Sequence, residues 1–367
     1  MKREPFLSFV LPLVLFFAGC PAPLSAPPTS PPEPVSAGKS PSTSDISGLL
    51  TRVDQTLAAN QQGRTLRTGI HGGWQVLHGV LAYGDQFEVE TPDGPRPAVQ
   101  FLAGGGSVDG FDPMPGDLLG DPPRTGLRME LQPTTKVGQG HRDQWLAVLA
   151  QAGLKLSDTI RSGSQLFQVE DWVRQVEWDT PLNVEEEFSW TLIALSAYRN
   201  SDHRWEARDG NTYSIETLLA VELSKDLPQS ACGGTHRLIG IAHSLRKRKR
   251  EGRPVNGVWK QAEELLEGSI QQARQNQNGD GSYSLSYHHR AGGIRDLGDA
   301  LGSTGHVLEF VATAADTETL RQAWVQRCVV KLCDLLDQCT AFNLECGVLY
   351  HALHGLQEYR ERMSEPG

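Results

Sequence analysis

The sequence has 367 residues, of which 34 are Lys or Arg and 44 are Asp or Glu, so its formal net charge is −10. This acidic balance argues against a general nucleic-acid-binding protein, and the length exceeds that of one minimal domain. Apolar residues make up 38% and charged residues 21% of the chain, which is typical of a globular protein. Only the N-terminus is continuously apolar, which excludes a polytopic membrane protein.

The N-terminus has the pattern of an export signal. Lys2 and Arg3 precede an apolar stretch, residues 6–18, that is shorter than the roughly 20 residues of a membrane-spanning helix. The stretch ends in Phe17-Ala18-Gly19-Cys20, which resembles the lipobox of bacterial lipoproteins, with Phe17 in place of the usual Leu. The resemblance implies removal of residues 1–19 and acylation of Cys20. The exported chain would then be anchored to the cell membrane or the outer membrane, facing the periplasm or the exterior; an ordinary signal peptide with a chance cysteine is the alternative.

A tether is expected after the lipidated cysteine. The 25 residues from Pro21 to Asp45 include eight Pro and six Ser. Such a composition cannot build a core and favours extended, solvated chain. We therefore expect residues 20–45 to form a disordered tether and residues 46–367 to form the folded domain.

Two kinds of predicted helix alternate through the rest of the chain. One kind is apolar on nearly all sides and is expected within residues 74–82, 145–150, 190–197, 236–242, 306–312 and 347–353. The other kind is amphipathic and is expected within residues 46–58, 169–176, 214–223, 258–273 and 319–336. An apolar helix must be enclosed, whereas an amphipathic helix can face water, so the alternation predicts an inner ring of helices wrapped by an outer ring.

Six inner and five or six outer helices, closed on themselves, predict an all-α fold of the α/α-toroid class. Matching positions of consecutive inner helices lie between 41 residues (Leu308 to Leu349) and 71 residues (Trp74 to Trp145) apart. An open superhelix of tetratricopeptide repeats is the structural alternative, but its repeat of about 34 residues does not fit these intervals.

Two insertions, residues 84–140 and 276–302, interrupt the alternation. The first contains an alternating stretch at residues 87–90, an Asp93-Gly94 turn, the segment Val99-Gln100-Phe101-Leu102 and the run Gly104-Gly105-Gly106. These features predict a small β-hairpin and a mobile loop. Loops of this length in a compact domain often cover or form a binding site.

The second insertion resembles a known superfamily. Residues 277–283 match the Q-x-x-x-G-x-W signature of terpenoid cyclases, with Tyr283 in place of Trp. Gly292-Gly293-Ile294-Arg295-Asp296 then looks like the Gly-Gly-Leu-Arg-Asp stretch of protein prenyltransferase β subunits. The resemblance to the terpenoid cyclase and prenyltransferase superfamily implies an α/α toroid. The D-x-D-D run of the cyclases and the zinc-binding Asp-x-Cys pair of the transferases are missing, so it does not extend to isoprenoid chemistry.

Polar residues gather where the inner helices are expected to begin. Parallel inner helices would bring their N-termini to one rim, where helix dipoles keep imidazoles neutral and favour anionic ligand groups. The turn at Gly233-Gly234 would let backbone approach a ligand there. Ordinary helix caps and hydrogen-bonded core histidines are the alternative. The candidate catalytic or ligand-binding residues are His71, His141, Asp143, Glu187, His236, Arg237, His306, Glu309 and His351.

The sequence predicts no cofactor and no metal ligands. Five cysteines follow Cys20 without forming a C-x-x-C pair: Cys232, Cys328, Cys333, Cys339 and Cys346. Buried free thiols are favoured, with a Cys339–Cys346 disulfide as the alternative in an exported chain. A zinc site remains an alternative only at His351 and His354, which lie one turn apart on the last inner helix.

The sequence favours a non-catalytic binding or scaffold module whose cavity takes an extracytoplasmic ligand. The alternative is a lyase or hydrolase acting on an anionic polysaccharide, because neutral histidine, arginine and carboxylate groups suit acid–base chemistry. The expected partners are membrane lipid, through acylated Cys20, and either an anionic glycan or a protein. Nucleic acid is not expected.

Overall fold

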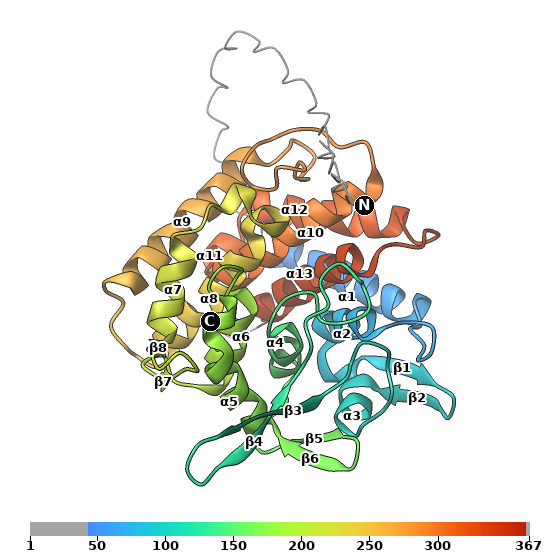
Figure 1. Ribbon diagram of the computed structural model, residues 1–367. Helices are drawn as coiled ribbons and strands as arrows, with labels where there is room; N and C mark the ends of the chain where they lie inside the picture. Colours follow the sequence, from blue (N-terminus) through green and yellow to red (C-terminus); the bar gives the residue numbers. More distant parts are fainter. Residues whose placement is uncertain (1–42, 365–367) are drawn as a thin grey trace, which may run out of the picture. The chain divides into compact units, whose positions relative to one another are not determined.

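The computed structural model describes residues 43–364, which fold mainly into α-helices (Figure 1). The all-α class is therefore confirmed. The predicted export signal, Cys20 and nearly all of the predicted tether lie outside the described residues. Within residues 43–364, no helix combines the length and the apolar character that crossing a bilayer requires.

Six helices are buried along most of their length, and they contain the six apolar segments. They are α2 (Gly73–Tyr83), α4 (Gln144–Gln151), α6 (Ser189–Tyr198), α8 (Thr235–Arg250), α10 (Leu297–Ala314) and α13 (Cys346–Ser364). Each of these helices contacts the next one in the chain, and α13 contacts α2, so the contacts close into a cycle. Their apolar character on nearly all sides follows from having neighbours on several sides.

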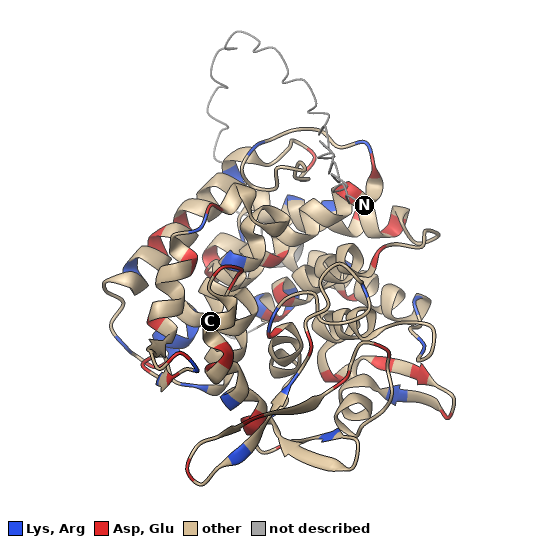
Figure 2. Cartoon of the chain, viewed as in Figure 1, with Lys and Arg blue, Asp and Glu red and all other residues tan. Residues whose placement is uncertain are grey.

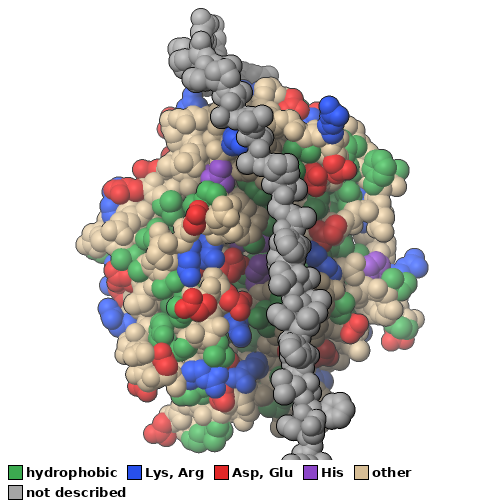
Figure 3. Space-filling model, turned by 45° about the horizontal axis from the view of Figure 1, so that its top comes forward, with side chains coloured by type: hydrophobic (Ala, Val, Ile, Leu, Met, Phe, Trp, Pro, Cys, Tyr) green, Lys and Arg blue, Asp and Glu red, His purple; other side chains and the backbone are tan. Residues whose placement is uncertain are grey.

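Amphipathic helices pack against this cycle. They are α1 (Thr43–Gly63), α5 (Val169–Asp179), α7 (Ile215–Leu223), α9 (Val258–Asn276) and α12 (Ala323–Gln338). For example, α12 contacts α1 and α10, and α7 contacts α6, α8 and α9. Acidic and basic residues alternate along the helical ribbons (Figure 2), and the surface seen in Figure 3 carries both kinds interspersed with one another.

One predicted amphipathic helix is divided in two. The segment expected within residues 319–336 forms α11 (Thr317–Leu320) and α12, which begins at Ala323. The break falls at Gln322, whose backbone is extended at φ −70° and ψ 146°. The side chain of Asp316 accepts a hydrogen bond from the Thr319 amide and so caps the start of α11.

Short antiparallel hairpins are the only strand pairs among the described residues. They are β1–β2 (Glu88–Thr91, Gly94–Pro97), β3–β4 (Met114–Leu119, Arg124–Arg128), β5–β6 (Thr159–Ser162, Gln165–Gln168) and β7–β8 (Arg204–Glu206, Thr212–Ser214). The first has the predicted stretch 87–90 and the Asp93-Gly94 turn, but its second strand follows the turn directly, and residues 99–102 of the predicted hairpin and loop region are helical instead. The other three hairpins are additional. Three hairpins lead directly into a helix: β2 into α3 (Ala98–Ala103), β6 into α5 and β8 into α7.

The start of α10 differs from the sequence prediction. The helix begins at Leu297, nine residues before His306. Asp296 supplies the cap, because its side chain accepts a hydrogen bond of 2.9 Å from the Asp299 amide. His306 and Glu309 therefore lie in the middle of a buried helix rather than at its first turn, and the second insertion ends at Asp296 rather than at residue 302.

The five described cysteines are all free, and four of them are buried. Burial raises the pKa of Cys328 and of Cys346, the latter to about 11. The Cys339–Cys346 disulfide is not formed. Cys232, which is only partly buried, has very different surroundings and belongs to the site described next.

Candidate functional site

Five histidine rings form a continuous group, called here the histidine cluster: His78 on α2, His141 just before α4, His236 on α8, His306 on α10 and His351 on α13. The distances between ring centroids along it are 5.5 Å (His141–His236), 5.4 Å (His236–His306), 4.3 Å (His306–His351) and 5.4 Å (His351–His78). The indole of Trp190 on α6 lies beside two of these rings, 6.3 Å from His141 and 5.6 Å from His236. The cluster thus brings polar side chains into an interior that is otherwise mostly apolar.

Backbone carbonyls fix the orientation of two cluster rings. Nδ1 of His78 lies 2.5 Å from the Trp74 carbonyl oxygen, and Nδ1 of His306 lies 2.7 Å from that of Gly302. A carbonyl can only accept, so Nδ1 carries the hydrogen in both rings. When neutral, each ring therefore presents Nε2 as an acceptor or a metal ligand.

Glu309 holds two histidines of α13 at once. Its carboxylate oxygens lie 2.8 Å from Nδ1 of His351 and 2.6 Å from Nδ1 of His354, and all three side chains are buried. Burial alone would raise the pKa of Glu309, but the charges and hydrogen bonds of the two imidazoles hold it well below its usual range. Burial lowers the pKa of His351, whereas for His354 the Glu309 carboxylate outweighs burial and raises it. The Glu309 carboxylate thus favours the protonated form of His354, whereas burial favours the neutral form of His351.

A second carboxylate pairs with the cluster at its more exposed end. Glu187 Oε1 lies 2.9 Å from Nδ1 of half-buried His141. Burial would raise the pKa of Glu187, but the hydrogen bond and charge of His141 lower it to about 2. His236 is close enough that it, His141 and Glu187 could together ligate a metal ion, because one ligand atom from each lies within 4.8 Å of the others.

Cys232 lies against the same cluster. It belongs to the short 3₁₀ turn η4 (Ala231–Gly234) before α8, and its backbone is left-handed at φ 51°. Burial would raise the pKa of its thiol, but His306 and His236 hold that pKa well below the usual value. Burial would also lower the pKa of His236, which Cys232 and nearby carboxylates instead raise to about 9. Cys232, His236 and His306 form a second group able to ligate a metal, again with ligand atoms within 4.8 Å of one another.

Three predicted site residues lie apart from the cluster. Arg237 donates two hydrogen bonds, of 2.8 and 2.7 Å, to the carboxylate of Glu222 on α7. Asp143 accepts a hydrogen bond of 2.6 Å from Thr191, and burial raises its pKa to about 6. The Nδ1 atom of His71 accepts a hydrogen bond from the Arg67 amide. The other predicted residues, His141, Glu187, His236, His306, Glu309 and His351, lie together.

The sequence prediction omitted Cys232, His78 and His354 from this group. Cys232 and His236 are four residues apart, a spacing that places two side chains on one helical face, but the glycines between them indicated a turn. His354 lies three residues after His351 and was considered only as part of a zinc pair. His78 lies within an apolar helix, where a histidine usually satisfies a neighbouring carbonyl.

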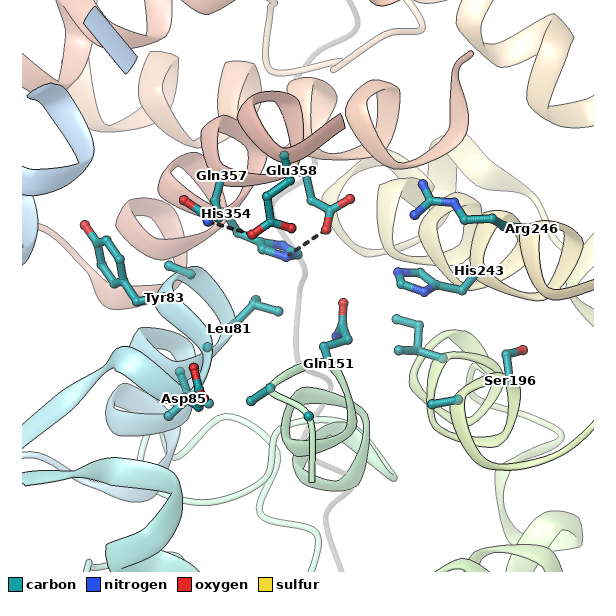
Figure 4. A pocket seen from close by; sticks show the side chains of 18 of the residues that line it. Leu81, Tyr83, Asp85, Gln151, Ser196, His243, Arg246, His354, Gln357 and Glu358 are labelled. Atoms are coloured by element: carbon teal, nitrogen blue, oxygen red, sulfur yellow. Dashed lines mark hydrogen bonds and ion pairs between the residues drawn. The ribbon is translucent and has the colours of Figure 1, made fainter. Parts of the chain in front are cut away.

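A cavity of about 560 Å³ lies at the other end of the helical cycle, where α2, α4, α6 and α8 end. Figure 4 shows His354 and Glu358 projecting into it from α13, opposite His243 and Arg246 of α8. A much smaller cavity of about 10 Å³ is lined by His236, Glu309 and His351. That volume is near the minimum for one water molecule. His354 lines both cavities, so it connects the histidine cluster with the large cavity.

In comparisons with known proteins, no family model, no curated protein and no solved structure matches this chain. The chemistry of the site therefore has to be inferred from its own residues.

His288 provides a testable source of acid sensitivity outside the cluster. Its side chain is fully buried and neither ring nitrogen has a hydrogen-bond partner among the described residues. Burial lowers the pKa of His288 to about 3, and the adjacent His289 contributes in the same direction. An unfolded chain takes up this proton below pH 6.5, whereas the folded chain does so only near pH 3.

Stability should consequently fall as the pH drops from about 6.5 towards 3. Because a histidine contributes at most about 1.4 kcal/mol per pH unit, the His288→Phe variant should lose about 2–3 kcal/mol less stability than the parent between pH 7.5 and pH 4.5. Urea unfolding at the two pH values measures this difference. Equal losses in both proteins would show that burial of His288 does not cause acid sensitivity.

Proposed function

We propose that this chain is an exported, lipid-anchored protein whose helical domain is an α/α toroid that binds an extracytoplasmic ligand. The closed cycle of buried helices and the amphipathic helices against it support the toroid. The resemblance of residues 277–312 to the terpenoid cyclase and prenyltransferase superfamily supports the same fold. The lipobox-like residues that end in Cys20 support the anchor.

The proposal of a binding function rests on the cavity of about 560 Å³. Its volume is within the range of about 300–1,000 Å³ that is usual for small-ligand sites. Arg246, Lys247 and Arg250 line it from α8, and Glu358 and Glu361 line it from α13. Guanidinium groups bind carboxylates and sulfates well. We therefore assign an anionic glycan fragment as the ligand, with its acidic groups towards α8, and a non-catalytic binding module as the function.

A lyase or hydrolase acting on an anionic polysaccharide is the second candidate, and His354 favours it. This residue lines the cavity, is held by Glu309 through Nδ1, and presents Nε2 at 3.9 Å from Glu358. A histidine oriented by a buried carboxylate is suited to proton transfer. The cluster would then serve acid–base chemistry rather than only the stability of the fold.

Thermal unfolding of the intact chain in detergent, with and without uronic-acid oligosaccharides, tests the binding proposal. A ligand at a hundred times its Kd should stabilise the fold by about 2.7 kcal/mol. Because a hydrogen bond to a charged group contributes about 1.5–3 kcal/mol, Arg250→Ser should weaken binding roughly 10- to 100-fold. Arg253→Ser is the matched control, because Arg253 is also exposed but pairs with Asp202 outside the cavity.

The same samples separate the two candidate functions. New carbon–carbon double bonds or new reducing ends, lost in His354→Gln, would favour the enzyme. Stabilisation without product would favour the binding module. Equal effects of Arg250→Ser and Arg253→Ser would place the ligand outside the cavity, and no stabilisation by any acidic oligosaccharide would count against an anionic glycan.

A further inference from the structure

Three atoms that commonly ligate transition metals converge between the start of α8 and the middle of α10. The Sγ atom of Cys232 and one ring nitrogen each of His236 and His306 all lie within 4.8 Å of one another. Ligands of a tetrahedral zinc ion lie about 3.5 Å apart, given zinc–ligand distances of about 2.0–2.3 Å. Small side-chain rotations are therefore enough to bring the three atoms to one ion.

The histidines of this group are prepared for ligation. His306 donates its Nδ1 hydrogen to the Gly302 carbonyl, which leaves the Nε2 lone pair for a metal. A hydrogen bond of this kind orients many metal-ligating histidines in proteins. His236 is 6% exposed, and neither of its ring nitrogens has a nitrogen or oxygen hydrogen-bond partner among residues 43–364, so the Cys232 thiol is the polar group left to it. A buried imidazole without such partners is costly, and a metal ion would satisfy it.

The thiol adds to this argument. Cys232 takes part in no disulfide, and its Sγ atom lies within 4.8 Å of one ring nitrogen of His236 and one of His306. The side chain of Thr235 donates a hydrogen bond of 2.9 Å to the Cys232 carbonyl and so ties the turn to α8. In an oxidising compartment an unprotected thiolate is liable to oxidation, and coordination to a metal would protect it.

The neighbouring group of His141, Glu187 and His236 shares one residue with this one. Glu187 already forms an ion pair with His141 at 2.9 Å, whereas Cys232 forms no disulfide and neither ring nitrogen of His236 has a nitrogen or oxygen partner among residues 43–364. The sequence also left His351 and His354 as a possible zinc-binding pair, but the Nδ1 atom of each ring is hydrogen-bonded to Glu309. The best available ligand set is therefore the one that contains the thiolate.

We propose that Cys232, His236 and His306 bind one divalent transition-metal ion, for which zinc has the matching chemistry. One thiolate and two imidazoles suit zinc, and three protein ligands leave a fourth position for water or another ligand. This inference goes beyond the proposed function, because it concerns the histidine cluster rather than the charged walls of the large cavity.

Metal titration of the intact, chelator-treated chain tests the proposal. Zinc should bind at one ion per chain, and Co²⁺ should give the absorption band of a thiolate-to-cobalt charge transfer. Cys232→Ser and His306→Gln should each weaken zinc binding by about a hundredfold or more, since even loss of a residue that only supports a ligand costs about 10- to 100-fold. Cys346→Ser, which also removes a buried thiol, should leave the affinity and the cobalt band unchanged.

The wild-type protein supplies a readout that does not depend on the variants folding. Bound zinc should slow alkylation of Cys232, located by peptide mass spectrometry, while Cys232 reacts readily without metal. Absence of stoichiometric binding, or alkylation that is unaffected by zinc, would show a reactive thiol only and overturn the proposal. A cobalt charge-transfer band that persists in Cys232→Ser would do the same. None of these results would bear on glycan binding at the large cavity.

Discussion

The Glu309→Gln variant is expected to destabilise the folded domain by about 3–5 kcal/mol, the usual cost of removing one partner from a buried ion pair. Glu309 is 2% exposed and accepts hydrogen bonds from both His351 and His354. A glutamine side chain has one acceptor oxygen and a donor amide, so it can accept from only one of the two rings. The other ring would face a donor, and His354 would lose the negative charge that stabilises its protonated form.

Urea unfolding of the parent and the variant measures this loss. Glu267→Gln is the matched control, because Glu267 is an exposed glutamate on α9 and its replacement should change stability by less than about 0.5 kcal/mol. If Glu309→Gln cost less than about 1 kcal/mol, His351 and His354 would have to find other partners, and Glu309 would not be what organises this part of the cluster.

The buried helices could be predicted from the sequence because burial on all sides leaves a clear signal. The segment 74–82 is apolar at nearly every position and lies within α2, and 190–197 lies within α6 in the same way. The exact start of α10 could not be predicted. Gly298, Gly302 and Gly305 weaken the helical signal over its first turns, so the helix seemed to begin near His306.

Of the three hairpins that were missed, β3–β4 is interrupted by a register shift between Pro115 and Leu118, and the other two offer few residues over which an alternating pattern could emerge. Strands β7 and β8 have three residues each, and β5 and β6 have four. Turn signals were nonetheless present at Ser162-Gly163 and Asp209-Gly210, of the same kind as the Asp93-Gly94 turn that did predict β1–β2. Both glycines have positive φ, 55° and 76°. A turn dipeptide before an amphipathic helix was thus the more useful signal in this chain.

The candidate site was only partly predictable, because helix periodicity locates a side chain on its own helix but not across the cycle of helices. Polar residues in apolar segments singled out His236, His306 and His351, whose rings lie together in the structure. Whether Arg237 faces the cluster or an outer helix depends on its angular position around α8. In the structure it faces α7, where it forms an ion pair with Glu222. The role of Cys232 depends on three successive left-handed residues at 232–234, which no periodic pattern reveals.

The contact between α10 and α13 leads to the second prediction, in which Gly305→Ala should destabilise the domain by about 2 kcal/mol. In an open helix interior, alanine is favoured over glycine by about 1 kcal/mol. Here an added Cβ on residue 305 would lie 2.7 Å from Cα and 2.8 Å from Cβ of Ala352. These atoms belong to the backbone of α13 or are fixed to it, so the two helices would have to move apart. Overpacking of this kind costs about 1–3 kcal/mol or more.

Gly268→Ala tests whether the effect comes from the close approach rather than from helix propensity. Gly268 lies on α9, and an added Cβ there meets nothing within 4 Å, so the same substitution should stabilise the domain by about 0.5–1 kcal/mol. The two variants should therefore shift the midpoint of urea unfolding in opposite directions. A stabilising Gly305→Ala would mean that α10 and α13 are further apart than described. Because Glu309 reaches His351 and His354 across this same contact, the hydrogen bonds of the cluster would then have to be longer as well.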